Sequence, residues 1–155
     1  MKKVTLLIIL TVFISQCGFK VVKFDDLLNF EINKINTSGD NRINYKIKNK
    51  LNLFKKTKQQ KVIGINIYSE KNKTIKEKNI KNEITKYQLN IKIKIEVLNQ
   101  NGNKIKEFTV NENGEYLVYK QYSKTLNNEK KLSETLTKKV IDQILDNLIN
   151  YSNEF

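Results

Sequence analysis

The clearest pattern in the chain is a strict alternation of apolar and polar residues from Tyr87 to Leu98. The apolar set consists of Tyr87, Leu89, Ile91, Ile93, Ile95 and Val97. A period of two places one face of a strand in a core and the other face in water. Asn101-Gly102 supplies the positive φ angles of a tight turn, so residues 99–103 are predicted to form a hairpin. The returning strand carries Ile105, Phe108 and Val110 and, after a bulge or second turn at Asn113-Gly114, continues from Tyr116 to Tyr122.

Two segments follow the period of a helix instead. The first predicts a helix over about 41–55, with Asp40 as its N-cap after a turn at residues 37–40. Its apolar face consists of Ile43, Ile47, Leu51 and Phe54. The second helix is predicted to begin at Asn127-Asn128-Glu129, where Glu129 is a helix-start acid in a favourable dipole position. Its wide stripe suits packing on a flat sheet and consists of Leu132, Leu136, Val140, Ile141, Ile144, Leu145, Leu148 and Ile149.

Shorter strands are predicted at residues 19–22, 30–35 and 62–69. Residues 70–86 are highly polar and fit neither period, so their plain interpretation is a solvated loop. The element order is strand, helix, three strands and helix. We therefore expect a single α+β domain, with two helices packed on one face of a four-stranded mixed or antiparallel sheet.

The N-terminus carries an export signal in place of a structural element. Met1-Lys2-Lys3 is a basic start, and Val4 to Ile14 is an apolar run that is too short to span a bilayer. Cys17 follows directly and is the only cysteine of the chain. The segment resembles a bacterial lipobox, although Gln16 stands where a small residue is usual. Residues 1–16 are thus predicted to be a signal peptide and 17–155 a lipoprotein domain anchored through acylated Cys17.

Composition narrows the function further. The 155 residues contain 29 Lys+Arg and 16 Asp+Glu, a net charge of +13, and no His, Pro or Trp. Without His there is no Ser-His-Asp triad, Cys-His pair or His-ligated metal, so we expect no enzyme, no cofactor and no metal. Arg42 is the only arginine, and an excess of Lys, Ile and Asn follows A/T-rich codons, so the charge alone does not define a polyanion site.

Other candidate chemistry is sparse. Asp142 and Asp146 lie one helical turn apart, as expected for a solvated helix face. Tyr116, Tyr119 and Tyr122 could stack bases, but tyrosine is an ordinary strand residue and an exported lipoprotein rarely meets nucleic acid. The polar segment before the main strand concentrates lysines that suit either a solvated loop or a phosphorylated glycolipid: Lys71, Lys73, Lys76, Lys78, Lys81 and Lys86.

The order of these features resembles the LptE family, the lipoprotein subunit of the outer-membrane lipopolysaccharide translocon. The resemblance covers residues 17–150 and rests on Cys17-Gly18-Phe19, the strand opened by Lys86-Tyr87-Gln88-Leu89, the return from Tyr116 to Tyr122, the helix entry Asn127-Asn128-Glu129 and the ending Gln143 to Leu148.

This resemblance implies a periplasm-facing, lipid-anchored protein of the outer membrane that plugs a large β-barrel partner and binds lipopolysaccharide. The family's basic positions fall on Ile80 and Leu126 here, so the implied lipopolysaccharide-binding residues are the neighbouring Lys78, Lys81 and Lys124. Two alternatives remain: a lipoprotein adaptor for another periplasmic protein, and a small hydrolase that uses two close carboxylates, one of them with a raised pKa.

Overall fold

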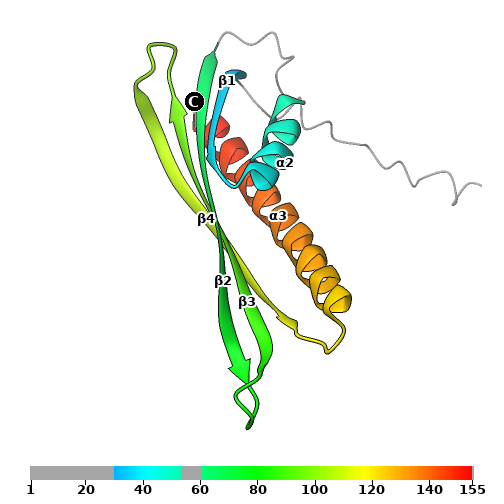
Figure 1. Cartoon of the computed structure of the whole chain (residues 1–155). Helices are drawn as coiled ribbons and strands as arrows, with labels where there is room; N and C mark the ends of the chain where they lie inside the picture. Colours follow the sequence, from blue (N-terminus) through cyan, green and yellow to red (C-terminus); the bar gives the residue numbers. More distant parts are fainter. Residues whose placement is uncertain (1–29, 54–60, 155) are drawn as a thin grey trace, which may run out of the picture.

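The computed structural model describes residues 30–53 and 61–154. The elements are β1 (Glu31–Gly39), α2 (Asn41–Asn52), β2 (Val62–Lys78), β3 (Ile84–Leu98), β4 (Lys104–Leu117) and α3 (Tyr122–Asn153). The sheet order is β1-β2-β3-β4; β1 is parallel to β2 and the other pairs are antiparallel. Both helices cover the same face of the sheet (Figure 1). The predicted α+β fold is confirmed.

The core lies between β3 and α3, as the two strongest patterns predicted. Ile91, Ile93 and Ile95 have no exposed surface, and Val140 of α3 is equally buried. One continuous apolar cluster joins them to β1, α2 and β2, and every fully buried residue in it lies between Phe30 and Leu148. Burial of this apolar cluster is a main source of stability for the described part of the chain.

The first turn of α2 follows the predicted capping chemistry. The Asp40 carboxylate accepts hydrogen bonds from the backbone N–H groups of Arg42 at 3.0 Å and Ile43 at 2.9 Å. Two boundaries differ from the prediction: α2 ends at Asn52 rather than near residue 55, and β1 continues to Gly39 through the segment expected to be a turn. Pairing with β2 keeps residues 37–39 extended, since each has a partner in the neighbouring strand.

The prediction of a loop over residues 70–86 is wrong, because β2 continues to Lys78 and β3 begins at Ile84. The paired backbone persists where the side-chain pattern disappears: Lys73 pairs with Leu89, and Ile75 with Tyr87. From Glu70 onward the β2 side chains are exposed, whereas Ile63, Ile65 and Ile67 are buried. No part of the core covers this stretch, so its side chains do not need to alternate between apolar and polar. The backbone hydrogen bonds to β3 hold it in the extended conformation.

The connection between β4 and α3 also differs from the prediction. The strand ends at Leu117 and the helix begins at Tyr122, five residues before the predicted entry at Asn127. The hydroxyl of Thr125 accepts a hydrogen bond from the Tyr119 N–H at 2.8 Å, which closes the connection into the helix.

Gly114 lies within the continuous β4 ladder, where the sequence had indicated a bulge or second turn. A Cβ at this position would lie 2.7 Å from Leu132 Cδ1, so the glycine permits α3 to approach the sheet.

Four sequence predictions lie outside the described residues: the signal peptide 1–16, acylated Cys17, a strand at 19–22, and Phe54 as the last residue of the apolar face of the first helix. Within residues 30–53 and 61–154, no helix has the length and apolar content needed to cross a membrane.

Candidate functional site

The far end of the β2–β3 hairpin, residues 75–87, projects beyond the helices (Figure 1) and is called the distal hairpin here. Its turn is fixed by Asn79. The side-chain oxygen of Asn79 accepts hydrogen bonds from the backbone N–H groups of Lys81 at 2.9 Å and Glu83 at 3.0 Å. The backbone N–H of Asn79 donates to the Glu83 carbonyl at 2.9 Å. Asn82 adopts a left-handed backbone with φ of 63°, which closes the turn. The tip is therefore a defined structure with a fixed shape.

Two of the three predicted binding residues lie on this turn. Lys78 donates through Nζ to the Asn82 side chain at 2.9 Å, and Lys81 is exposed beside the tip. Lys124 lies in the first turn of α3, where its Nζ is 4.2 Å from the centroid of the Tyr119 ring. The Val118 N–H donates to the Thr85 carbonyl at 2.9 Å, so the chain leading into α3 starts at the base of the distal hairpin. The structure thus places the two predicted neighbourhoods at one end of the molecule, on separate elements.

Most lysines of this region are paired with carboxylates at the surface of the fold. Lys76 lies 3.4 Å from Glu115, and Lys86 lies 3.0 Å from Glu77 and 3.6 Å from Glu115. These contacts raise the pKa of Lys86, with the Glu77 hydrogen bond as the largest cause. Within the described residues, Lys78 and Lys81 have no carboxylate partner. Among the described residues 70–86, the lysines without a carboxylate partner therefore lie at the tip, on the same turn as the Glu83 carboxylate, which accepts a hydrogen bond from the Asn79 side chain at 2.7 Å.

A half-buried polar cluster joins the hairpin to α3, and sequence reasoning missed it. Lys73 Nζ lies 2.8 Å from Glu129 Oε2, and the Tyr116 hydroxyl donates to the same oxygen at 2.7 Å. Lys73 also lies over the Tyr87 ring, 4.2 Å from its centroid. We name these four residues the Glu129 cluster. Glu129 had been interpreted as a helix-start acid, but the early start of α3 places it in the second turn, facing the sheet.

The Glu129 cluster shifts the ionisation of its members. Burial would raise the pKa of Glu129, but Lys73 and Tyr116 outweigh it and hold that pKa below its ordinary range. Burial would likewise lower the pKa of Lys73, yet the hydrogen bond to Glu129 leaves it raised. Burial and Glu129 together raise the pKa of Tyr116 to about 12. At neutral pH the cluster is an ion pair with a protonated phenol, as expected of a structural clamp.

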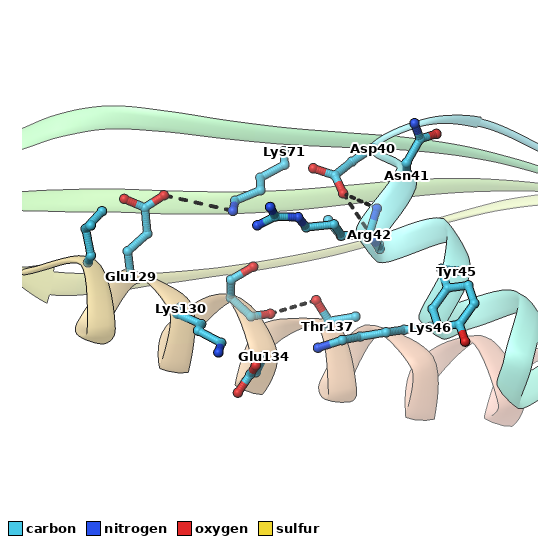
Figure 2. A pocket seen from close by; sticks show the side chains of 13 residues that line it. Asp40, Asn41, Arg42, Tyr45, Lys46, Lys71, Glu129, Lys130, Glu134 and Thr137 are labelled. Carbon is cyan, nitrogen blue, oxygen red and sulfur yellow. Dashed lines mark hydrogen bonds and ion pairs between the residues drawn. The ribbon is translucent and has the colours of Figure 1, made fainter. Parts of the chain in front are cut away.

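A cleft of about 760 Å³ opens between the start of α2 and the first half of α3 (Figure 2). Arg42 extends from the start of α2 into the cleft, toward Lys71, and Lys71 Nζ lies 3.9 Å from Glu129 Oε1. Three acids line the cleft. The Asp40 carboxylate caps the N-terminus of α2, and Glu129 forms ion pairs with lysines, so two of the three already have partners within the protein. Because Glu129 itself lines the cleft, the cleft adjoins the Glu129 cluster.

Glu96 and Glu107 form a close pair of carboxylates on the uncovered face of the sheet. Glu96 and Glu107 are cross-strand partners bridged by Lys94, at 3.3 Å and 3.1 Å. A hydrogen bond from Asn66 lowers the pKa of Glu96, and Lys104 lowers that of Glu107. Both shifts are opposite to the raised pKa of a general acid. In the described part of the chain, no group of three acidic, His or Cys side chains could hold a metal ion.

Comparison with known proteins identifies the fold. No family model and no curated protein matches the sequence. Solved structures of bacterial lipoproteins do match. A minor lipoprotein from Acinetobacter baumannii has a TM-score of 0.60 at 12% identity, covering 78% of this chain and 92% of that one. Lipoprotein B from Nitrosomonas europaea has a TM-score of 0.59 at 13% identity, covering 81% and 88%. Rare lipoprotein B from Shewanella oneidensis has a TM-score of 0.50 at 12% identity, covering 79% and 95%. The chain shares its fold with these proteins.

Proposed function

We propose that the protein is a lipid-anchored lipoprotein of the outer membrane that plugs a large β-barrel translocon and helps to bind, assemble and insert lipopolysaccharide. The fold shared with bacterial lipoproteins supports the lipoprotein assignment, together with the apolar run that ends at Cys17. The observation that carries the lipopolysaccharide role is the unpaired charge at one end, from Lys78 and Lys81 on a fixed turn and Lys124 on α3. Flexible cations of this kind suit the phosphates of a lipid head group.

The uncovered face of the sheet supports the plug role. Asn36 donates to Asn66 at 2.9 Å, Asn66 donates to Glu96 at 3.3 Å, and Lys94 joins Glu96 to Glu107. A row of hydrogen-bonded polar side chains thus crosses all four strands. Such a face suits the wet, polar interior of a large barrel. On this proposal the protein acts by binding and shape, without catalysis.

Binding of purified lipopolysaccharide to the chain from Gly18 to Phe155, which keeps every core residue that the structure describes, tests the site. The variant Lys78→Glu/Lys81→Glu/Lys124→Glu should lose affinity and keep its thermal transition. Salt should weaken binding by the unmodified protein more than binding by the variant, since exposed charges are screened. The matched control places three glutamates at exposed Lys46, Lys48 and Lys138. Equal loss in both variants would reduce the effect to net charge and reject the site.

Photocrosslinking in cells tests the barrel. A crosslinker at Lys92 or Asn111, both on the uncovered sheet face, should give an adduct of barrel size. Adducts with small periplasmic proteins alone would favour the adaptor function and reject the plug. Intact mass of the membrane-extracted protein tests the anchor independently: it should lack residues 1–16 and include acyl chains on Cys17.

A further inference from the structure

The tip of the distal hairpin exposes an isoleucine completely. Ile80 has a relative exposure of 103%, the largest among the exposed apolar residues of the described chain. Single apolar residues on a surface are ordinary, but Ile80 is held there by the fixed turn around Asn79. A side chain that cannot fold back onto its own protein is available to a second molecule with little further loss of conformational entropy.

The surroundings of Ile80 combine unpaired charge with further apolar surface. Lys78 and Lys81 flank it and have no carboxylate partner within the described residues, although lysines farther back along the hairpin are paired. The same end also exposes other apolar side chains of β2, β4 and α3: Ile75, Leu117, Tyr122 and Leu126. The one acid of the turn, Glu83, accepts a hydrogen bond from the Asn79 side chain at 2.7 Å. An apolar point beside lysines that lack a carboxylate partner is the arrangement that enters a lipid interface, where acyl chains lie just beneath phosphates.

We propose that the distal hairpin is a lipid-insertion wedge, in which Ile80 enters the acyl layer of a phosphorylated lipid while Lys78 and Lys81 contact the phosphates. The inference deepens the proposed function, on which it rests for the identity of the lipid as lipopolysaccharide. Insertion is shallow, because the flanking Asn79 and Asn82 are polar and already bonded within the turn. The wedge would separate acyl chains at one point, while the rest of the hairpin stays in water.

The absence of tryptophan from the chain makes the test direct. In the protein from Gly18 to Phe155, Ile80→Trp places the single tryptophan at the tip. Its emission should shift to shorter wavelength with vesicles of phosphatidylcholine containing lipopolysaccharide or phosphatidylglycerol, and brominated acyl chains should quench it. Vesicles of phosphatidylcholine alone should leave the emission unchanged. The matched reporter is Ile105→Trp, since Ile105 is an exposed isoleucine of β4 beside the 99–103 turn at the opposite end of the sheet. It should show neither effect.

Affinity variants complete the test. Ile80→Ala should weaken vesicle binding roughly ten- to fifty-fold, from the methylene groups no longer buried, whereas Ile105→Ala should leave it unchanged. Unchanged circular dichroism would show that both variants remain folded. Insertion into phosphatidylglycerol and lipopolysaccharide alike would support the wedge and contradict a specific lipopolysaccharide role. Lipopolysaccharide binding without quenching at residue 80, or a blue shift only with a protein partner, would overturn the wedge and leave the proposed function standing.

Discussion

Replacing Glu129 by glutamine should weaken the attachment of the β2–β3 hairpin to α3. The two side chains have nearly the same shape, so the change removes charge and leaves packing intact. The carboxylate oxygen that meets Lys73 at 2.8 Å also accepts from the Tyr116 hydroxyl at 2.7 Å, and the second oxygen lies 3.9 Å from Lys71. Glutamine can still accept from Tyr116 through its one oxygen, so the expected loss is that of the ion pairs.

The size of the effect follows from the exposure of the partners. A hydrogen bond between charged groups contributes about 1.5–3 kcal/mol when shielded from water. The Lys73 side chain is 39% exposed and that of Glu129 is 22% exposed, so solvent screening reduces this value. We expect Glu129→Gln to lower the free energy of unfolding by about 1 kcal/mol at neutral pH.

Urea denaturation of a double-mutant cycle with Lys73→Gln measures the pair itself. Glu134→Gln, an exposed acid of α3 without an ion pair in the described residues, is the matched control and should change stability little. The pKa of folded Glu129 is lowered from about 4.5, so its contribution is complete above that value and is lost as pH falls through the lower, folded pKa. The difference between the two proteins should shrink in acid. A coupling energy of zero, or a difference that persists unchanged in acid, would refute this account of the cluster.

Three further predictions concern the fold and its ionisation. Ile93→Ala should cost about 2–5 kcal/mol, since the side chain is wholly buried, and an unchanged urea midpoint would show otherwise. Gly39→Ala should be strongly destabilising, because φ is +96° and the new Cβ would lie 1.9 Å from the Ser69 carbonyl oxygen; Gly102→Ala, at φ +82° with open space around it, should cost only the backbone strain of about 1–2 kcal/mol. Tyr116 should ionise near pH 12, seen as the ultraviolet difference from Tyr116→Phe, and its stabilisation should disappear between about pH 10 and 12, because the raised pKa favours the protonated phenol.

The features that sequence reasoning predicted correctly depend on local rules or on a complete core. Alternation from Tyr87 to Leu98 identified β3, because one face of that strand is covered along most of its length. Asp40 was identified as an N-cap because its bonds reach only two and three residues ahead. The apolar stripe of α3 also predicted correctly which face of the helix is buried, because each buried position of that face contacts the same core as β3.

The features that were missed depend on partners far away in the chain. The second half of β2 has no apolar alternation, and only its pairing with β3 shows that it is a strand. Glu129 lies 56 residues from Lys73, so no local pattern could have joined them. The signal that was available is the placement of Lys71, Lys73 and Ile75 at alternate positions, the same side as the buried isoleucines before them. Lysines on the inner side of a strand indicate a charged partner above, and Glu129 is that partner.

The two ends of the sheet are stabilised by different interactions, and this difference links stability to the proposed binding end. Near β1 and α2 the sheet is held by apolar burial, whereas toward the distal hairpin it is held by backbone pairing and the ion pairs of Lys73, Lys76 and Lys86. Weakening the Glu129 cluster should therefore loosen the hairpin before it unfolds the core. Amide hydrogen exchange should increase first in residues 71–90 of Glu129→Gln, while the amides around Ile93 retain their protection. A turn that is rigid but carried on a loosened base would present Ile80, Lys78 and Lys81 less precisely. Lipid binding should then weaken in Glu129→Gln even though the substituted residue lies outside the tip, and by less than in Ile80→Ala.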